Sequence, residues 1–439
     1  MKRFIEAELR KWAKSKRRKP LIVKGARQVG KTYIIKKFGE ENFDNLVMLD
    51  LERNPQWHKI FEGELNPKQI CSDLELVLNT KIIPGKSLLF IDEIQAFPKA
   101  LTALRYFYEE MPDLHVIAAG SLIEFVLNKI SFPVGRLQFL KLNPLGFVEF
   151  LHANGHEKAV QKLLAPPQKL SDTIHGFILR QLREYFFVGG MPECVLTYRD
   201  SGSLKKAFEV HSEIITSYRM DFTKYSPSVD NKCLNIVITS LAQNVGNQIK
   251  YLKLAEGFSN PTIKKAYNLL VLANLSHNIP SVSPTGLPLG ASASGKKFKS
   301  IMVDIGIMHS LCEMNTSREY SLPDLLNIYR GAMAEQFIGQ EIALSQHDRI
   351  FYWSRQAKSS TAEVDYVIVV NNKIIPIEVK SGSAGRLRSM HIFFDNFKNC
   401  PGGFVFSSRP YEILSGQKLT FIPLYYCFSA TKSENGFKL

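Results

Sequence analysis

One stretch near the start of the chain combines residue types that could bind phosphate groups. Residues 25–32 match the pattern G-x-x-x-x-G-K-[ST] without a mismatch. Gly25 and Gly30 permit positive φ and a close backbone approach, so that consecutive N–H groups can surround an anion. Lys31 adds positive charge for terminal phosphates, and the Thr32 hydroxyl is a type of ligand that Mg²⁺ accepts. The alternative is a glycine-containing turn that matches by chance. The predicted nucleotide-binding positions are Gly25, Ala26, Arg27, Gln28, Val29, Gly30, Lys31 and Thr32.

Two adjacent carboxylates form the second signal. The four apolar residues 88–91 are followed by Asp92 and Glu93. Such a run is typical of a buried parallel strand, and α/β sheets bind ligands at the carboxyl ends of their strands. We expect Asp92 to hold Mg²⁺ through water and Glu93 to orient or deprotonate an attacking water. Acidic residues also simply end strands, but the phosphate-loop pattern upstream favours the catalytic interpretation.

Two further polar positions have two interpretations each. Ser121 follows the apolar run 115–120, where it could sense a γ-phosphate or cap the next helix. Arg136 precedes a short apolar run at 139–142, which is where an arginine finger would fall. If Arg136 acts on a neighbouring subunit, the protein is a homo-oligomer. The alternative is an arginine that is solvated or paired in a salt bridge.

A second group of charged residues lies in the C-terminal third. Two β-rich runs, 362–370 and 373–380, are joined by the turn residues 371–372 and predict a hairpin. Asp365 begins the first run, while Glu378 and Lys380 project from one face of the second. Two carboxylates could hold Mg²⁺ or Mn²⁺ while a lysine assists phosphodiester cleavage. A solvated hairpin with alternating charges is the alternative.

The elements around these residues alternate in type. Apolar runs at 21–23, 46–49, 88–91 and 115–120 alternate with helical patterns, which predicts a three-layer α/β fold with a parallel sheet. Residues 151–230 have mostly helical patterns. Three short helical stretches within 234–275, followed by a strand near 279–282, suggest a winged helix. Its Lys264 and Lys265 could face DNA phosphates, or the module could serve for protein docking and packing.

Composition narrows the class of protein. The chain has 439 residues, enough for two to four domains, and a formal net charge of +15, which favours nucleic acid as a partner. No apolar run approaches the roughly 18 residues of a membrane span, so no membrane partner is expected. The six cysteines are scattered without C-x-x-C spacing. Together with a charged N-terminus unlike a secretory signal, this favours a cytoplasmic protein without zinc or disulfides.

The N-terminal signals together support a family resemblance. Residues 25–32, 90–93, 120–121, 135–136 and 143–145 resemble the corresponding motifs of prokaryotic AAA-type ATPases. The form of the phosphate loop is similar to the group whose ATPase domain precedes an uncharacterised C-terminal region. Residues 189–193 and 353–382 are similar to marks of that region. The resemblance covers residues 20–150 for the ATPase part and implies ATP binding, hydrolysis and Mg²⁺.

The C-terminal constellation resembles the PD-(D/E)XK nucleases. Glu335, in the helical stretch 331–336, would match the helix-borne acid of the Holliday-junction-resolvase branch. All four polar positions of that pattern are then filled, by Glu335, Asp365, Glu378 and Lys380. Val364 stands where the pattern has proline. The resemblance implies a nuclease-like fold, and both cleavage and a fold retained for binding stay open.

These inferences predict four parts: an AAA-type P-loop ATPase domain (1–150), a helical lid or linker (151–230), a winged-helix-like module (231–295) and a PD-(D/E)XK nuclease-like α/β domain (296–439). One functional hypothesis is an Mg²⁺-dependent ATPase coupled to a nuclease-like domain that acts on or binds nucleic acid. The other is a nucleotide-controlled switch or adaptor with a catalytically silent C-terminal fold, which binds a protein partner or DNA.

Overall fold

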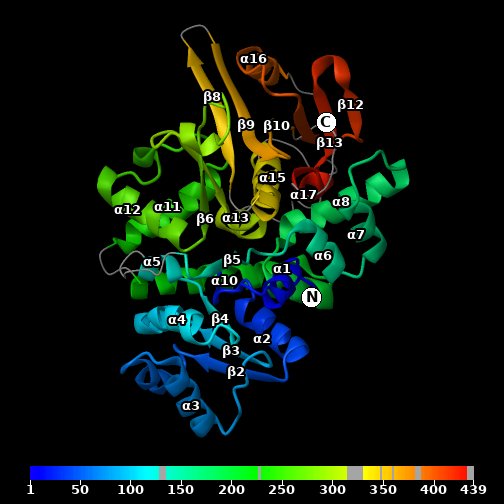
Figure 1. The fold of residues 1–439 in the computed structure, drawn as a ribbon. Coiled ribbons are helices and arrows are strands. Elements are labelled where there is room, and N and C mark those ends of the chain that lie inside the picture. The colour runs from blue at the N-terminus through cyan, green and yellow to red at the C-terminus, as the bar shows by residue number, and fades with distance from the viewer. Residues whose placement is uncertain are drawn as a thin grey trace. The chain divides into compact units, whose positions relative to one another are not determined.

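The computed structural model describes residues 1–127, 135–225, 229–313, 330–346, 349–357, 360–380 and 387–432 (Figure 1). The chain divides into two compact units. The N-terminal unit comprises Lys2–Asn143 with Leu272–Asn274, and the C-terminal unit comprises Met1, Pro144–Val271 and Leu275–Leu439. The boundary between the two units thus lies between Asn143 and Pro144. The parts predicted separately as 231–295 and 296–439 belong mostly to one unit. The four-part division stays a proposal.

The N-terminal unit is built on one parallel sheet. Its strands have the order β2-β3-β4-β1-β5, and every neighbouring pair is parallel. They are β1 (Leu21–Lys24), β2 (Asn45–Asp50), β3 (Ser87–Asp92), β4 (His115–Gly120) and β5 (Gln138–Lys141). β3 and β4 are buried along their whole length, as uninterrupted apolar runs predict for a sheet that is covered on both faces. The prediction of a parallel α/β sheet is confirmed.

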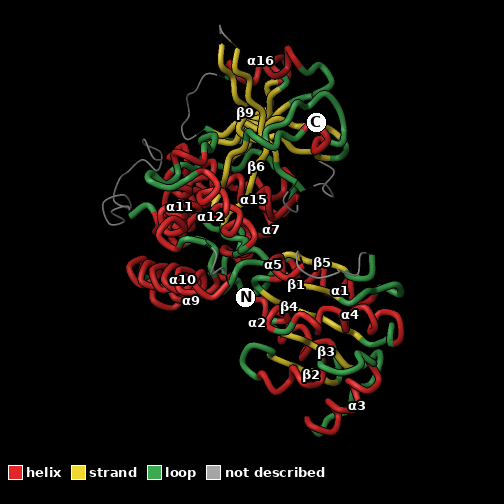
Figure 2. Tube along the Cα trace, turned by 90° about the vertical axis from the view of Figure 1, so that its left-hand side faces the viewer, coloured by secondary structure: helices red, strands yellow, loops and turns green. Residues whose placement is uncertain are grey.

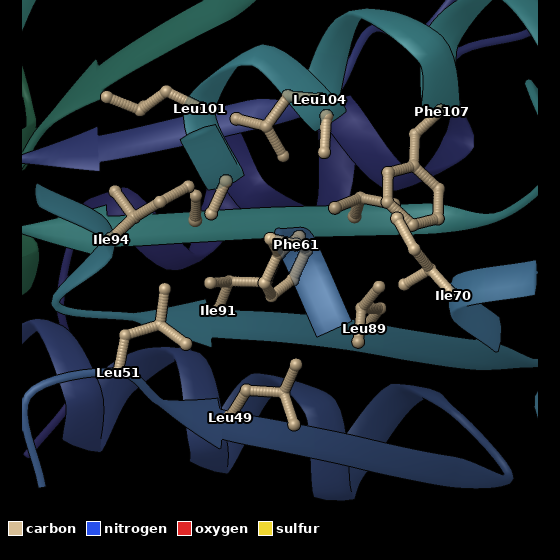
Figure 3. Close-up of a cluster of buried hydrophobic side chains, with 14 of the residues drawn as sticks. Leu49, Leu51, Phe61, Ile70, Leu89, Ile91, Ile94, Leu101, Leu104 and Phe107 are labelled. Atoms are coloured by element: carbon tan, nitrogen blue, oxygen red, sulfur yellow. The ribbon is translucent and has the colours of Figure 1, made fainter. Parts of the chain in front are cut away.

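Helices connect these strands. They are α1 (Ile5–Lys14), α2 (Lys31–Asn42), η1 (Pro55–Phe61), α3 (Pro67–Leu78), η2 (Ile94–Ala96), α4 (Pro98–Glu110) and α5 (Ile123–Leu127). The start of α3 is encoded locally, because the Asn66 side chain accepts from the N–H groups of Lys68 and Gln69 and Pro67 occupies the first turn. Figure 3 shows Leu49 of β2 and Ile91 of β3 on the sheet face that α4 covers with Leu101, Leu104 and Phe107. This core fixes the strand ends that carry the predicted site.

The first half of the C-terminal unit is mainly helical. Its described elements are α6 (Phe147–Ala153), α7 (Glu157–Leu164), α8 (Asp172–Val188), α9 (Pro192–Ser201), α10 (Leu204–Tyr225), α11 (Asn231–Gln243), η3 (Tyr251–Lys253) and α12 (Asn260–Leu272). An antiparallel pair follows, β6 (Ser276–Pro280) and β7 (Phe298–Met302), with η4 (Leu289–Ser292) between its strands and α13 (Ile305–Leu311) after it. This order of elements agrees with the winged-helix prediction, but the pair crosses the boundary predicted at residue 295.

The second half contains a mixed sheet with the order β12-β13-β11-β10-β9-β8. Its strands are β8 (Phe351–Ala357), β9 (Ser360–Val370), β10 (Lys373–Val379), β11 (Gly403–Ser407), β12 (Glu412–Leu414) and β13 (Leu419–Pro423). The remaining helices are α15 (Arg330–Gln346), α16 (Arg388–Asn396), η5 (Ser415–Gln417), η6 (Leu424–Tyr426) and α17 (Cys427–Thr431). β8, β9 and β10 form an antiparallel meander, and β10, β11 and β13 are parallel. Figure 2 shows β9 among the strands of this sheet.

The predicted hairpin is confirmed, since β9 and β10 are joined by Asn371 and Asn372, which both adopt positive φ. Two successive left-handed residues are what the tightest hairpin turns require, and asparagine tolerates this conformation better than most side chains. None of the helices in the described ranges has an apolar stretch of the kind that a membrane span needs.

Candidate functional site

The predicted phosphate loop connects the end of β1 to the start of α2. Gly25 has a φ of 151°, and a Cβ at this position would overlap the carbonyl oxygen of Leu142. Gly30 is left-handed, with a φ of 91°, and is the residue from which α2 begins. Both glycines are therefore required by the backbone path. The first amides of α2 have no partner within the helix, so they are free to bind an anion placed before it.

Lys31 lies inside this loop. Its side chain is buried, and its Nζ donates to the carbonyl oxygens of Gly25 at 3.1 Å and Ala26 at 2.7 Å. Burial lowers the pKa of Lys31 to about 8, despite the opposing charges of Glu93 and Asp92. An anionic phosphate at the loop would add the negative charge that a buried ammonium needs.

The two predicted Mg²⁺ ligands meet across the sheet. The Thr32 hydroxyl donates to Oδ2 of Asp92 at 2.6 Å, although β4 separates β1 from β3. The backbone N–H of Glu93 donates to the other carboxylate oxygen of Asp92 at 3.0 Å. Burial raises the pKa of Asp92 to about 6, and the hydrogen bond from Thr32 opposes this shift. A hydroxyl and a carboxylate in contact are the hard oxygen donors that fit Mg²⁺.

Glu93 follows β3 in a strained conformation. Its φ is 46°, which a residue other than glycine rarely adopts and which is concentrated at functional sites. Its carboxylate accepts from the side-chain amide of Gln95. The carbonyl oxygen of that amide occupies the space where a Cβ of Gly120 would lie, at the end of β4. Gln95 therefore positions Glu93, and no sequence pattern singled it out.

Ser121 and Arg136 lie at opposite ends of the parallel strands. Ser121 is buried directly after β4, at the carboxyl edge where β1 delivers the phosphate loop. Its two predicted roles both stay open. Arg136 precedes β5, which is parallel to β1, and therefore lies at the amino edge. It pairs with Glu109 at 2.7 Å. Within one chain Arg136 is thus a salt-bridged arginine, and its action on a neighbouring subunit stays a prediction.

Arg3 also supports the loop and was not predicted. Its guanidinium donates to the carbonyl oxygen of Val29 at 3.3 Å and to that of Asn143 at 2.5 Å. Arg3 thereby joins the phosphate loop to the chain after β5. Since these contacts span 26 and 140 residues of sequence, no local motif could have indicated them.

The C-terminal unit brings the second predicted set together from α15, β9 and β10. Nζ of Lys380 lies 2.5 Å from Oε1 of Glu378. Asp365 is held by the backbone N–H of Val379, which donates to its Oδ2 at 2.7 Å. Glu335 lies near Asp365, because both carboxylates contact the ammonium of Lys299, at 2.9 Å and 3.7 Å. The arrangement of these four residues agrees with the predicted pattern, while their catalytic and metal-binding roles stay predictions.

A lysine that the sequence did not indicate lies among these acids. Nζ of Lys299, from β7, is 2.9 Å from Glu335, 2.5 Å from Glu363 and 3.7 Å from Asp365. Its side chain is 1% exposed and lies over the ring of Tyr352, 5.4 Å from the centroid. Burial lowers the pKa of Lys299, but the three carboxylates outweigh burial and hold it above its ordinary value. The ammonium is therefore a permanent charge of the cluster.

Burial also shifts the pKa values of the carboxylates in this cluster. Desolvation raises the pKa of Glu335 to about 7, against the opposing effect of Lys299. Burial and the charge of Asp365 raise the pKa of Glu378 to about 8, against the opposing effect of Lys380. The two lysines thus favour the charged forms of carboxylates that are costly to bury.

The acid cluster does not fit a divalent cation in this arrangement. Within the described ranges, no three histidine, cysteine, aspartate or glutamate side chains are placed to hold a metal ion. The position between Glu335, Glu363 and Asp365 holds the Lys299 ammonium instead. One buried oxygen, Oε2 of Glu378, accepts no hydrogen bond from the described residues.

The Gly189–Gly190 turn has a structural role. The backbone N–H of Gly190 donates to the buried carboxylate of Asp304 at 2.6 Å. Asp304 also accepts from the N–H groups of Gly306 and Ile307 and so caps α13. Burial raises the pKa of Asp304 to about 6, against these hydrogen bonds.

Elsewhere in this unit, the Lys264 and Lys265 side chains are exposed on α12. This exposure agrees with either predicted use of that helix, DNA binding or protein docking.

The comparisons with solved structures show low overall similarity. The Walker-type ATPase PABY2304 of Pyrococcus abyssi is 17% identical, with 70% of this chain and 95% of that chain covered and a TM-score of 0.44. The Aeropyrum pernix ORC1 protein, solved in complex with DNA, is 13% identical, with 72% and 94% covered and a TM-score of 0.30. The RuvB Holliday junction branch migration motor of Thermotoga maritima is 15% identical, with 64% and 89% covered and a TM-score of 0.29. A search of curated proteins finds no match.

Three family models match separate parts of the chain. Residues 179–318 match a domain of unknown function, DUF8612, and residues 330–427 match another, DUF4143. Residues 17–151 match the AAA domain, and this range contains the phosphate loop, Asp92, Glu93 and Ser121. The chain therefore contains an AAA-type P-loop ATPase domain, a family that implies ATP as ligand and Mg²⁺ as its ion.

Proposed function

We propose that this protein is an ATP-hydrolysing switch, in which nucleotide turnover in the N-terminal unit controls binding by the C-terminal unit. The observation that carries the ATP-hydrolysing part of the proposal is the contact of Thr32 with Asp92, made next to the buried ammonium of Lys31. The contact places the two Mg²⁺ ligands at the carboxyl ends of the strands. The ammonium of Lys31 and the carboxylate of Glu93 lie at the same ends.

Each residue has a distinct part in the proposed reaction. The amides of residues 25–32 and the Lys31 ammonium bind the β- and γ-phosphates. Thr32 and Asp92 would hold Mg²⁺, which neutralises the developing charge. Glu93 orients the attacking water, and Gln95 holds Glu93 in its strained position. Ser121 contacts the γ-phosphate end of the same edge.

Two substitutions separate binding from turnover. Lys31→Ala should abolish ATP binding, measured by calorimetry on the full chain, while Glu93→Gln should keep binding and lose turnover. The matched control is Lys36→Ala, an exposed lysine on α2 whose ion pair with Glu40 is confined to the helix surface. Normal ATP binding by a folded Lys31→Ala protein would refute the assigned site. Normal turnover by Glu93→Gln would refute the role of Glu93.

A second candidate function is metal-dependent cleavage of nucleic acid in the C-terminal unit. The meeting of Glu335, Asp365, Glu378 and Lys380 favours it, and the net charge of +15 favours a polyanionic partner. Cleavage through a metal would require the Lys299 ammonium to leave the position between the acids. The switch, in contrast, requires no metal in the cluster.

Incubation with DNA distinguishes the two candidates. The full chain is given ATP, Mn²⁺ or Mg²⁺ and single- and double-stranded DNA, with Asp365→Ala as the paired variant. The switch predicts no cleavage that depends on Asp365. Cleavage that Asp365→Ala abolishes would establish the second candidate.

DNA binding is tested separately by changing Lys264 and Lys265 to glutamate. If α12 faces DNA phosphates, this double change lowers both the DNA affinity and the salt dependence of that affinity.

A further inference from the structure

The buried lysine of β7 does not belong to the part of the chain that supplies the acids around it. Lys299 lies within the 179–318 match, whereas Glu335, Glu363 and Asp365 lie within the 330–427 match. Its ammonium nevertheless contacts all three carboxylates. The acid cluster of the C-terminal family region is thus completed by a cation from the region before it.

The backbone around Lys299 is held in place from several sides. Met302, three residues further along β7, exchanges two hydrogen bonds of 2.8 Å with the Gln336 side chain of α15. The carbonyl oxygen of Phe298 accepts from the N–H of Ile249 at 2.9 Å. β7 is therefore fixed against the helix that carries Glu335, and Lys299 enters the cluster from a rigid strand.

The acids themselves leave little room for a second cation. Oδ2 of Asp365 accepts from the N–H of Val379, and Oε1 of Glu378 is taken by Lys380. A Cβ on Gly246 would lie 2.7 Å from Oε2 of Glu335, so the backbone closes that side of the carboxylate. The Tyr352 ring covers the ammonium on another side.

We propose that Lys299 is a built-in counter-ion that occupies the place of a divalent cation and prevents the acid cluster from binding one. A cation near a fixed ammonium is repelled, and at about 4 Å this repulsion is large in a buried site. The inference goes beyond the ATP-dependent switch and does not rest on it. If it fails, the assignment of the phosphate loop is unaffected.

The test uses the full-length protein without nucleotide and MnCl₂ as the probe. Bound Mn²⁺ is measured by electron paramagnetic resonance for the wild type, Asp365→Asn, Lys299→Met and the double variant. Binding at the phosphate loop is common to all four proteins, so only the part that depends on Asp365 reports on the cluster. Lys299→Met keeps the length of the side chain and removes its charge.

We expect wild type and Asp365→Asn to bind the same amount of Mn²⁺. Lys299→Met should bind Mn²⁺ at least about tenfold more tightly, because a like charge is removed, and the double variant should lose this gain. Mn²⁺ binding by the wild type that Asp365→Asn abolishes would overturn the proposal, whether or not Lys299→Met folds. A folded Lys299→Met protein that gains no Mn²⁺ binding would overturn it as well.

Discussion

Gly25 shows how one backbone position controls the nucleotide site. Its φ of 151° and the nearby carbonyl oxygen of Leu142 leave no space for a side chain. Gly25→Ala must therefore displace either the loop or the chain after β5, and strain of this kind costs on the order of 1–3 kcal/mol. We expect ATP affinity to fall by about tenfold or more, since each 1.4 kcal/mol of mispositioning is tenfold in affinity. Calorimetric titration of ATP measures the loss.

Gly63→Ala is the matched control for this change. No atom lies within 4 Å of the position where its Cβ would be. The same chemical change should therefore leave ATP affinity unaltered. If Gly25→Ala bound ATP as tightly as Gly63→Ala, the loop would not need the close approach to Leu142.

At this scale the sequence predicted residues that belong to a motif and missed those that belong to none. The eight loop residues were predictable because the chemistry lies in one uninterrupted run. Gln95, Arg3 and Lys299 were not, because each acts through partners that only the folded chain brings near. Lys299 reaches Glu335 of α15, and Glu363 and Asp365 of β9, from a strand outside the sheet that contains β9. A lone lysine in a short strand carries no pattern that distinguishes it from a solvated one.

At the scale of elements, α15 is the centre of a buried polar network. Gln340 accepts from the N–H of Ile305 at 2.9 Å and donates to the Tyr185 hydroxyl at 2.7 Å. Glu341 accepts from the N–H of Phe147 at 2.9 Å. The polar side chains from Glu335 to Glu341 are buried rather than forming a solvent-facing stripe. Periodicity alone therefore could not show which face of this helix is covered.

Glu341 makes the stability of the C-terminal unit depend on pH. Burial raises its pKa to about 8, against the hydrogen bond from Phe147. The folded state then binds more protons than the unfolded chain between the ordinary glutamate pKa and about 8, so stability falls as pH rises through that window. Glu341→Gln keeps an acceptor for Phe147 and removes the titration. Above pH 8 we expect the variant to be more stable by on the order of a few kcal/mol.

Urea unfolding of the wild type and Glu341→Gln at pH 5, 7 and 8.5 measures this difference. The two proteins should converge at pH 5 and separate as pH rises. Some pH dependence should persist in the variant, because burial also raises the pKa of Asp304, to about 6. Glu209→Gln, an exposed position on α10, is the control and should follow the wild type. Equal unfolding midpoints of Glu341→Gln and wild type at pH 8.5 would contradict the prediction.

At the scale of the molecule, the two sheets differ in how well the sequence predicted them. Alternation of buried runs and helices was sufficient for the N-terminal sheet, because each strand of a parallel sheet is an apolar run followed by a helix. In the C-terminal sheet only the β9–β10 hairpin was predicted, from its asparagine turn. The short strands β11, β12 and β13 pair with partners set by tertiary packing. Their apolar runs do not by themselves indicate strand rather than helix.

Arg136 carries the prediction that this protein works as an assembly. Its place at the amino edge of the sheet, paired with Glu109, prevents it from reaching the phosphate loop of its own chain. If it acts on a neighbour, Arg136→Ala should lower ATP turnover by about 10³-fold, the lower range for an arginine finger, while ATP affinity changes little. Arg105→Ala is the matched control, because Arg105 pairs with the same carboxylate at 3.1 Å.

Mixing two inactive variants tests whether Arg136 works between subunits. Lys31→Ala lacks a working phosphate loop but keeps Arg136, and Arg136→Ala has the opposite defect. If equal amounts of the two variants mix at random in a head-to-tail assembly, about a quarter of the interfaces pair an intact phosphate loop with an intact Arg136. Turnover of the mixture should therefore rise to about a quarter of wild type, far above either variant alone. If both variants fold and bind their neighbours but the mixture stays inactive, Arg136 is only the surface salt bridge to Glu109. Turnover would then depend on residues of one chain.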